Sequence, residues 1–173
     1  MNNPAVSTAD KYGNTRITVK GIKYAEFASE ETNCFTASVY LDGKRLGEAH
    51  NDGHGGETWF HPYMVDDKAK MAESEAYAES LPPMDCSDIG AADLLPMTLE
   101  LLINSIVVDY LNAKTEKAFE AKMKRLCNTK VVLKEGDAYF TISGKYQSQR
   151  KDQIVAKYPN ATIMNEVWNI AYA

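Results

Sequence analysis

The stretch FTASVYLDGKRLGEAH, residues 35–50, decides the fold of this chain. From Phe35 to Leu41 apolar residues alternate with polar ones, a period of two residues that is typical of a strand buried on one face. Asp42-Gly43 follows directly, and this pair favours a type I′ turn, in which both central residues take positive φ. We therefore predict a β-hairpin whose second strand covers Lys44–His50.

A further strand is expected before the hairpin. Ile17 and Val19 alternate with polar residues, and Ile22 and Tyr24 continue the pattern after a shift of register. The shift falls at Gly21, and it is typical of a strand that carries a β-bulge. Together with the hairpin, this strand predicts an N-terminal three-stranded unit.

Two helices are expected in the middle of the chain. The first is predicted to begin at Asp66-Asp67, because acids favour a helix N-terminus, and to end before Pro82-Pro83. Its alanines recur at helical spacing and predict a small-residue packing face: Ala69, Ala72 and Ala76.

The second helix is predicted to begin near Asp93 and to supply the main core face. Its apolar residues recur at spacings of three and four: Leu95, Leu99, Leu102, Ile103, Ile106, Val107 and Tyr110. The apolar residues after Asn112 fall on a different face of the helix, so we expect a kink or a break near Asn112–Thr115.

The last fifty residues predict a strand, strand, helix, strand unit. Two strands, Lys130–Leu133 and Ala138–Ile142, flank the turn residues Glu135-Gly136-Asp137. A helix over Gln147–Tyr158 and a strand over Ala161–Met164 follow. The chain is therefore expected to be an α+β protein with a mainly antiparallel sheet, an N-terminal three-stranded unit, central helices and a C-terminal β-β-α-β unit.

At 173 residues and 45% hydrophobic content, the chain is expected to form a single domain over residues 1–173, with residues 1–14 as a loose N-terminal arm. The most apolar window, residues 94–111, is interrupted by charged residues, so no membrane span is expected. No secretory signal is visible, and the cytoplasm is the expected compartment. Three cysteines, Cys34, Cys86 and Cys127, lie far apart and are expected to be reduced, buried thiols.

The net charge of −5 is distributed unevenly. Residues 62–90 hold seven acids against two bases, and residues 114–134 hold seven bases against two acids. The acidic helix, with Glu73, Glu75 and Glu79, is a candidate surface for a basic partner, and residues 114–134 are a candidate surface for nucleic acid. Two solvated helix faces are the simpler interpretation of the same pattern.

All three histidines fall within twelve residues, His50 to His61, and they flank the glycine-rich run Asn51–Glu57. Glycines let the backbone approach a ligand closely, and the polar side chains of the run can bind one. We predict a binding site here that extends to the aromatic residues after the run. Its predicted members are Asp52, His54, Glu57, Trp59, Phe60 and His61, with Tyr63 beside them.

A metal site is the alternative for this loop, with His50, Asp52, His54 and His61 as candidate ligands of Zn²⁺ or a similar ion. Their spacing matches no strong metal motif. Asp52-Gly53-His54-Gly55-Gly56 also resembles the signature of metal-dependent protein phosphatases, in which the Asp and the first Gly carbonyl bind metal. No later Asp-Gly or Gly-Asp-Ser element could complete a two-metal site, so a structural glycine-rich turn is the simpler interpretation and no cofactor is expected.

A longer resemblance covers roughly residues 15–60. Three groups of residues resemble uncharacterised small proteins of bacteriophages and prophages: the run Glu26–Thr32, then Cys34-Phe35, Ala37, Val39-Tyr40 and Asp42-Gly43-Lys44, and the run Asn51–Gly56. Small phage proteins of this kind often act by stoichiometric binding, including inhibition of host defence systems. The resemblance implies a phage context, and in that context we expect a non-catalytic protein that acts in the host cytoplasm and binds a host macromolecule. A host protein is the expected partner, and nucleic acid bound through residues 114–134 is the alternative.

The function that we expect from the sequence is thus binding without catalysis. The alternative is a small metal-dependent hydrolase, or a protein that sequesters a small ligand, centred on the His50–His61 loop. The largely apolar core helix and the exposed aromatic residues leave a homodimer open.

Overall fold

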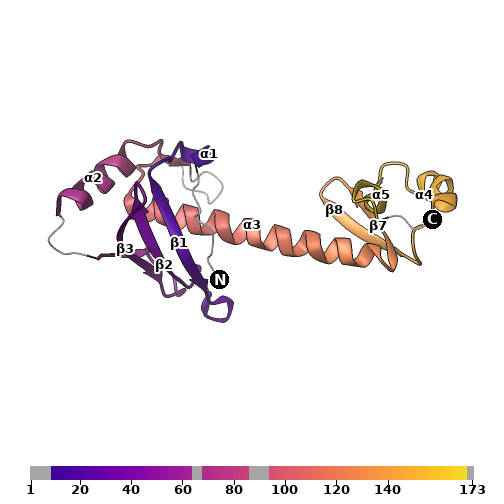
Figure 1. Ribbon diagram of the computed structural model, residues 1–173, viewed down its shortest axis with the longest axis horizontal. Helices are drawn as coiled ribbons and strands as arrows, with labels where there is room; N and C mark the ends of the chain where they lie inside the picture. The colour runs from indigo at the N-terminus through magenta and orange to yellow at the C-terminus, as the bar shows by residue number, and fades with distance from the viewer. Residues whose placement is uncertain (1–8, 64–67, 86–93, 171–173) are drawn as a thin grey trace. The chain divides into compact units, whose positions relative to one another are not determined.

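The computed structural model describes residues 9–63, 68–85 and 94–170 (Figure 1). Its contacts divide the chain into two compact units, residues 1–112 (unit 1) and 113–173 (unit 2). The sheets are antiparallel and combine with helices, so the predicted α+β fold is confirmed. The single domain stays a prediction. The expected helix start at Asp66-Asp67, the thiol of Cys86 and most of the N-terminal arm lie outside the described residues. The predicted helix start near Asp93 is wrong, because Leu94–Leu95 pair as a short strand and the helix begins only at Leu99.

Unit 1 is built on a four-stranded antiparallel sheet with the strand order β1-β2-β3-β4. The strands are β1 Ile17–Tyr24, β2 Phe35–Leu41, β3 Lys44–Asn51 and β4 Trp59–Pro62. The predicted hairpin is confirmed, because Asp42 and Gly43 both take positive φ, 48° and 76°. The predicted bulge is confirmed as well, since the register of β1 against β2 shifts between Lys20 and Lys23, around Gly21. The fourth strand was not predicted, because four residues are too few to show an alternation.

The other elements of unit 1 are short except for two helices. They are α1 Ala9–Tyr12, η1 Glu26–Ala28, α2 Lys68–Glu79, the paired strands β5 Met84–Asp85 and β6 Leu94–Leu95, and the first part of α3 Leu99–Cys127. One face of the four-stranded sheet forms a core with α3, as Figure 1 shows. The predicted core residues of this helix are buried: Leu99, Leu102, Ile103, Ile106 and Val107. Two residues differ: Leu95 belongs to β6 and is 43% exposed, and Tyr110 is half-buried and packs against this core.

The predicted small-residue face of α2 is wrong. Ala69, Ala72 and Ala76 are exposed, and the buried residues of the helix are Ser74 and Ala78. Met71 and Tyr77 lie beside these two and pack against the core of unit 1. Their larger side chains remove more apolar area from water than three alanine methyl groups can, and they decide which face is turned inward.

The predicted break near Asn112–Thr115 is also wrong, because α3 is helical throughout. The segment contains neither proline nor glycine, and its alanine and lysine residues are good helix formers. The change of apolar face has another cause. Residues up to Leu111 pack in the core of unit 1, whereas Met123 and Cys127 pack in a core of unit 2.

Unit 2 confirms the predicted β-β-α-β order. Its three-stranded antiparallel sheet has the order β8-β7-β9, with β7 Lys130–Glu135, β8 Ala138–Ser143 and β9 Thr162–Ile163. The expected helix is the short turn η3 Ser148–Arg150 followed by α4 Lys151–Lys157, and α5 Met164–Val167 follows β9. Val131 and Leu133 pack with α4 on one side of β7, and Val132 packs with the end of α3 on the other.

Cys127 is buried in this second core, and Cys34 of unit 1 is half-buried; both are free thiols. Burial raises the pKa of the Cys127 thiol. The predicted burial is therefore confirmed for Cys127, whereas Cys34 is only partly covered.

A buried tyrosine ties α5 to the rest of unit 2. Tyr146 is fully buried, and its hydroxyl donates a hydrogen bond to the carboxylate of Glu166, which also pairs with the Lys151 ammonium at 2.9 Å. Burial, together with the adjacent carboxylate, raises the pKa of Tyr146 to about 12. The hydrogen bonds from Tyr146 and Lys151 lower the pKa of Glu166.

These pKa shifts predict a pH dependence of the stability of unit 2. Because the folded-state pKa of Tyr146 lies above that of an unfolded tyrosine, near 10, its contribution is complete below pH 10 and is lost as the pH rises towards 12. We compare the slope of the free energy of unfolding against pH between pH 10 and 12. This slope should be steeper in the wild type than in Tyr146→Phe, by up to about 1.4 kcal/mol per pH unit. Urea denaturation monitored by Trp168 fluorescence in a Trp59→Phe background measures this difference. Equal slopes in the two proteins would contradict it, and Tyr24→Phe should behave as the wild type.

Candidate functional site

The glycine-rich run is closed on itself by one buried side chain, that of Asn51. Its Oδ1 accepts hydrogen bonds from the Gly53 amide at 2.9 Å and from the Thr32 hydroxyl at 2.7 Å. Its Nδ2 donates to the carbonyl oxygens of Gly56 and Glu57 at 3.3 and 3.4 Å. Asn51 is 5% exposed, so its hydrogen-bonding capacity is used within the protein rather than for a ligand.

Gly53 attaches the run to a second segment, 25–34. Its carbonyl oxygen accepts hydrogen bonds from three successive amides, those of Glu30, Glu31 and Thr32, at 2.9, 3.0 and 3.3 Å. Its φ is +87°, and a Cβ atom at this position would overlap the Ala28 carbonyl oxygen. The carbonyl that binds metal in the phosphatase signature is thus already occupied by three amide donors.

Segment 25–34, which we name the Phe27 loop, is further ordered by Ser29. The Ser29 hydroxyl donates to the Ala25 carbonyl at 2.9 Å and accepts from the Cys34 amide at 2.9 Å. The Ala25 amide donates to the Cys34 carbonyl at 3.0 Å, which closes the base of the loop. At its tip, in η1, Phe27 is 95% exposed. The hydrogen bonds therefore hold an apolar side chain in water on an ordered backbone.

Acidic residues occur on the Phe27 loop and on the glycine-rich run that is hydrogen-bonded to it. The Phe27 loop and the glycine-rich run contain five acids and neither lysine nor arginine. All five are exposed: Glu26, Glu30, Glu31, Asp52 and Glu57. His54 Nδ1 lies 3.2 Å from the Glu30 carboxylate, and both side chains are largely exposed. The two segments thus form one acidic surface with a phenylalanine at its tip.

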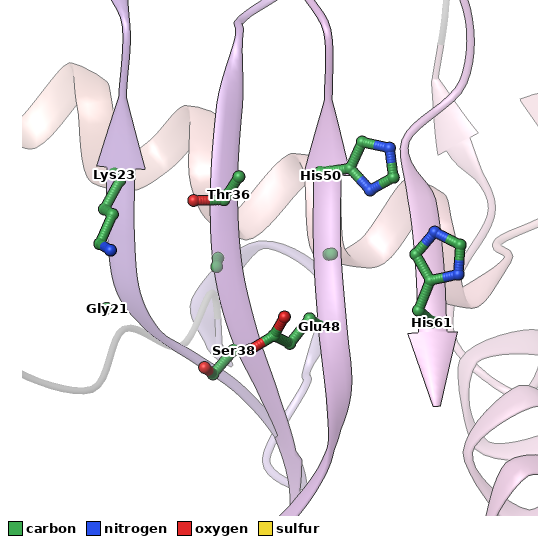
Figure 2. Close-up of a pocket in the computed structure, with 9 residues that line it drawn as sticks. Gly21, Lys23, Thr36, Ser38, Glu48, His50 and His61 are labelled. Carbon is green, nitrogen blue, oxygen red and sulfur yellow. The ribbon is translucent and has the colours of Figure 1, made fainter. Parts of the chain in front are cut away.

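A second candidate surface is the face of the four-stranded sheet that points away from the core, which we name the open sheet face. On it the ring of His50 stacks with Trp59 at 6.4 Å and with His61 at 5.2 Å, between centroids. The two histidines border a hollow of about 470 Å³ that is lined by polar side chains (Figure 2). Its polar lining comprises Lys23, Thr36, Ser38, Glu48, His50 and His61. Trp59 is 63% exposed at the edge strand β4.

The structure separates the residues that the sequence analysis assigned to one binding site. Trp59 and His61 lie on the open sheet face, whereas Asp52 and His54 lie in the glycine-rich run. Phe60 points to the opposite side of β4, is half-buried and packs on the core, so it is not part of an exposed aromatic edge. Strand alternation explains the difference, because neighbouring residues of a strand point to opposite faces. Glu57 lines a separate hollow of about 560 Å³, with Thr58, Leu101 and Asn104 among its neighbours.

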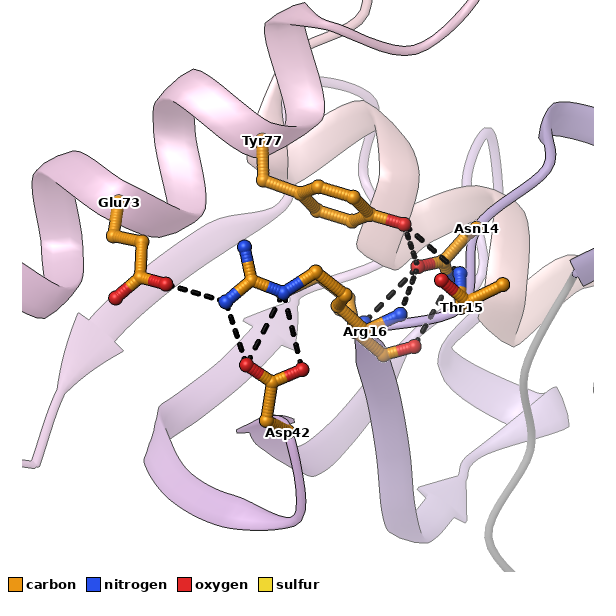
Figure 3. A network of polar contacts seen from close by, with 7 residues as sticks. Asn14, Thr15, Arg16, Asp42, Glu73 and Tyr77 are labelled. Carbon is orange, nitrogen blue, oxygen red and sulfur yellow. Dashed lines mark hydrogen bonds and ion pairs between the residues drawn. The ribbon is translucent and has the colours of Figure 1, made fainter.

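The acidic helix is only partly available for a partner. Glu73 pairs with the guanidinium of Arg16, which also binds Asp42 of the hairpin turn at 2.6 Å (Figure 3). These contacts raise the pKa of Arg16 and lower that of Asp42. The Tyr77 hydroxyl accepts from the Thr15 amide at 2.9 Å beside this cluster. Glu73 is thus a structural residue, while Glu75 and Glu79 are exposed.

The four candidate metal ligands do not converge. His50 and His61 stack on the open sheet face, while His54 contacts Glu30 and Asp52 is exposed in the run. Within the described part of the chain, no group of three or more His, Cys, Asp or Glu side chains is placed to hold a metal ion. The structure therefore gives the metal-dependent hydrolase no site at this loop.

Sequence reasoning missed the Phe27 loop, although one signal was present. Phe27 is a lone aromatic residue in an acidic stretch, without the alternation that would place it in a core. The role of Asn51 was also missed, because its partner Thr32 becomes a neighbour only through the fold.

No family model matches this chain, and neither a curated protein nor a solved structure is significantly similar to it. Among the residues that the structure describes, no helix is both long enough and apolar enough to cross a membrane.

Proposed function

We propose that this protein is a non-catalytic binding protein, and that the Phe27 loop of unit 1 is its contact with a protein partner. One observation carries the proposal. Phe27 is 95% exposed, and the backbone of its loop is held by hydrogen bonds between Ala25 and Cys34 and by three amides that donate to the Gly53 carbonyl. A large apolar side chain in water is unfavourable for an isolated protein and becomes favourable when a partner covers it.

The order of the loop supports a binding role. Binding costs free energy when a flexible segment must be ordered, and a loop that is already ordered avoids that cost. The Gly53 carbonyl, the Asn51 amide and the Ser29 hydroxyl hold the Phe27 loop before any partner arrives. The glycine-rich run is, in this proposal, the support of the binding loop rather than the binding site itself.

The charges around Phe27 indicate the chemistry of the partner. Five exposed carboxylates without a lysine or arginine in either segment favour a basic protein surface and would repel the phosphates of a nucleic acid. The partner that we propose offers an apolar pocket for Phe27 with lysine or arginine residues at its rim. Aromatic residues at the centre of an interface commonly carry most of the binding free energy, and rim charges mainly affect the association rate.

The resemblance to small phage proteins extends this proposal. It suggests a bacterial host protein as the partner, and inhibition of a host defence system as the consequence of binding. The cytoplasm of the host cell would then be the place of action.

Differential capture from a bacterial lysate tests the proposal. Phe27→Ser removes the anchor, and Trp59→Ser is its matched control, because it removes another exposed aromatic residue of unit 1. We expect a protein captured by the wild type to be retained by Trp59→Ser, and to bind Phe27→Ser at least about 30-fold more weakly. Titration of that purified protein against each variant measures the difference.

A second pair of variants tests the acidic surface. Glu26→Gln/Glu30→Gln should slow association and weaken its dependence on salt, whereas Glu75→Gln/Glu79→Gln makes the same change of charge on α2 and should have little effect. Loss of capture in Trp59→Ser with retention in Phe27→Ser would transfer the site to the open sheet face. Equal capture by all variants would contradict a role of the Phe27 loop.

A further inference from the structure

The charge of the chain divides at the boundary between the two units. Unit 2 holds eleven lysine and arginine residues against six acids, a net charge of +5, and unit 1 holds eight against eighteen, a net charge of −10. A positive unit of this size attracts polyanions over the distance of a Debye length, whereas unit 1 repels them. The two units are therefore suited to different partners.

Part of the positive charge of unit 2 lies on one face of its sheet. Lys130, Val132 and Lys134 alternate along β7, and their cross-strand partners in β8 are Ser143, Thr141 and Tyr139. Val132 is buried under the end of α3, but Lys130, Thr141 and Ser143 are exposed. The acid at the end of β7, Glu135, belongs to the opposite face by the alternation of the strand. The side chains of this face that are not buried are Lys130, Lys134, Tyr139, Thr141 and Ser143, and we name them the basic face.

Aromatic rings contact Lys134 of this face and Lys124 of α3. The Lys134 ammonium lies 5.4 Å from the centroid of the Tyr139 ring, and Tyr139 stacks with Trp168 at 6.5 Å. Lys124, on α3, lies 5.6 Å from the Trp168 ring, and Phe119 meets Tyr139 edge-on at 5.2 Å. These rings are engaged by one another and by lysines, so they position ammonium groups rather than offer free faces on which unpaired bases would stack.

We propose that the basic face of unit 2 binds the phosphate backbone of double-stranded DNA without reading its sequence. Lysine, serine, threonine and tyrosine side chains are common phosphate contacts, and all four types occur on this face. The engaged rings favour a duplex over a single strand, because recognition of single strands generally uses stacking on aromatic faces. The inference goes beyond the binding of a protein by unit 1, because it concerns another unit and another class of partner.

Fluorescence anisotropy of the full chain with a labelled 20-base-pair duplex tests the proposal, and one strand of that duplex provides the comparison. The variant Lys130→Gln/Lys134→Gln removes two charges from the basic face. The control Lys145→Gln/Lys157→Gln makes the same change of net charge in unit 2, with Lys157 on α4 and neither residue in β7 or β8.

We expect the wild type to bind the duplex with a Kd in the range of about 10⁻⁶ to 10⁻⁴ M at physiological salt, more tightly than the single strand. The basic-face variant should weaken binding at least about tenfold at low salt and should reduce the slope of log K against log salt by about 2. The control variant should stay within about threefold of the wild type, since nonspecific charge effects are small once the contacts are kept.

Three results would overturn the proposal: no binding to the duplex, equal weakening by the two lysine pairs, or tighter binding to the single strand. Phe27→Ser should bind DNA like the wild type. Failure of DNA binding and failure of protein capture are therefore distinguishable.

Discussion

Replacing Gly53 by alanine is expected to disrupt the Phe27 loop and to destabilise unit 1 by more than about 3 kcal/mol. Two costs combine at this position. The φ of +87° is unfavourable for any residue with a Cβ atom, and that atom would overlap the Ala28 carbonyl oxygen and lie 2.9 Å from Cys34 Cβ. The obstacle is backbone, which cannot rotate away, and moving it breaks the three amide hydrogen bonds to the Gly53 carbonyl.

Gly21→Ala is the matched control for this prediction. Gly21 also has positive φ, +64°, but no atom lies within 4 Å of the position of its Cβ, so only the conformational cost of about 1 kcal/mol is expected. Urea denaturation monitored by Trp59 fluorescence in a Trp168→Phe background gives the two free energies. Hydrogen exchange at the amides of Glu30, Glu31 and Thr32 should accelerate in Gly53→Ala alone. An equal cost at Gly21 and Gly53 would show that the loop is not held as described.

Asn165→Ala is expected to have an effect of comparable size on unit 2, a loss of about 3–5 kcal/mol. Asn165 is fully buried, and its Oδ1 accepts from the Val132 amide at 2.8 Å. Its Nδ2 donates to the carbonyl oxygens of Cys127 and Lys130 at 3.2 and 3.0 Å. Alanine would leave one buried amide and two carbonyl groups without these bonds, and an unsatisfied buried group costs about 1–3 kcal/mol.

The control for Asn165 is Asn160→Ala, an exposed residue after α4, which should change the stability by less than about 0.5 kcal/mol. Asn165→Asp keeps the acceptor for the Val132 amide but turns a carboxylate oxygen towards two carbonyl oxygens, so it should not restore stability. Unfolding in urea, measured by Trp168 fluorescence in a Trp59→Phe background, separates the three proteins. A loss at Asn165 no larger than at Asn160 would contradict the bridging role.

Buried asparagines explain why parts of this protein could not be predicted locally. Asn51 joins the glycine-rich run to Thr32, and Asn165 joins α5 to the end of α3 and to β7. In each case the partners are separated by nineteen or more residues in the sequence. No periodicity reveals such a contact, because asparagine is equally common in exposed turns.

The candidate site likewise has one feature that the sequence reveals and one that it does not. The glycine-rich run was recognisable as a special loop, because its composition permits backbone conformations that other residues avoid. The partners of its backbone carbonyl groups could not be recognised. Whether its carbonyl groups face a metal, a ligand or another loop depends on which segment lies beside it, and that segment is the Phe27 loop.

The sequence by itself determined the elements whose signals are local. The alternation in β1, β2, β7 and β8, the Asp42-Gly43 turn, the bulge at Gly21 and the core face of α3 were all readable, because neighbours along the chain produce them. Three other features are set by tertiary contacts: the pairing of β4, the inward face of α2 and the support of Phe27 by Gly53. Each of these depends on free energy gained between segments that are distant in the sequence, and a local pattern does not contain that information.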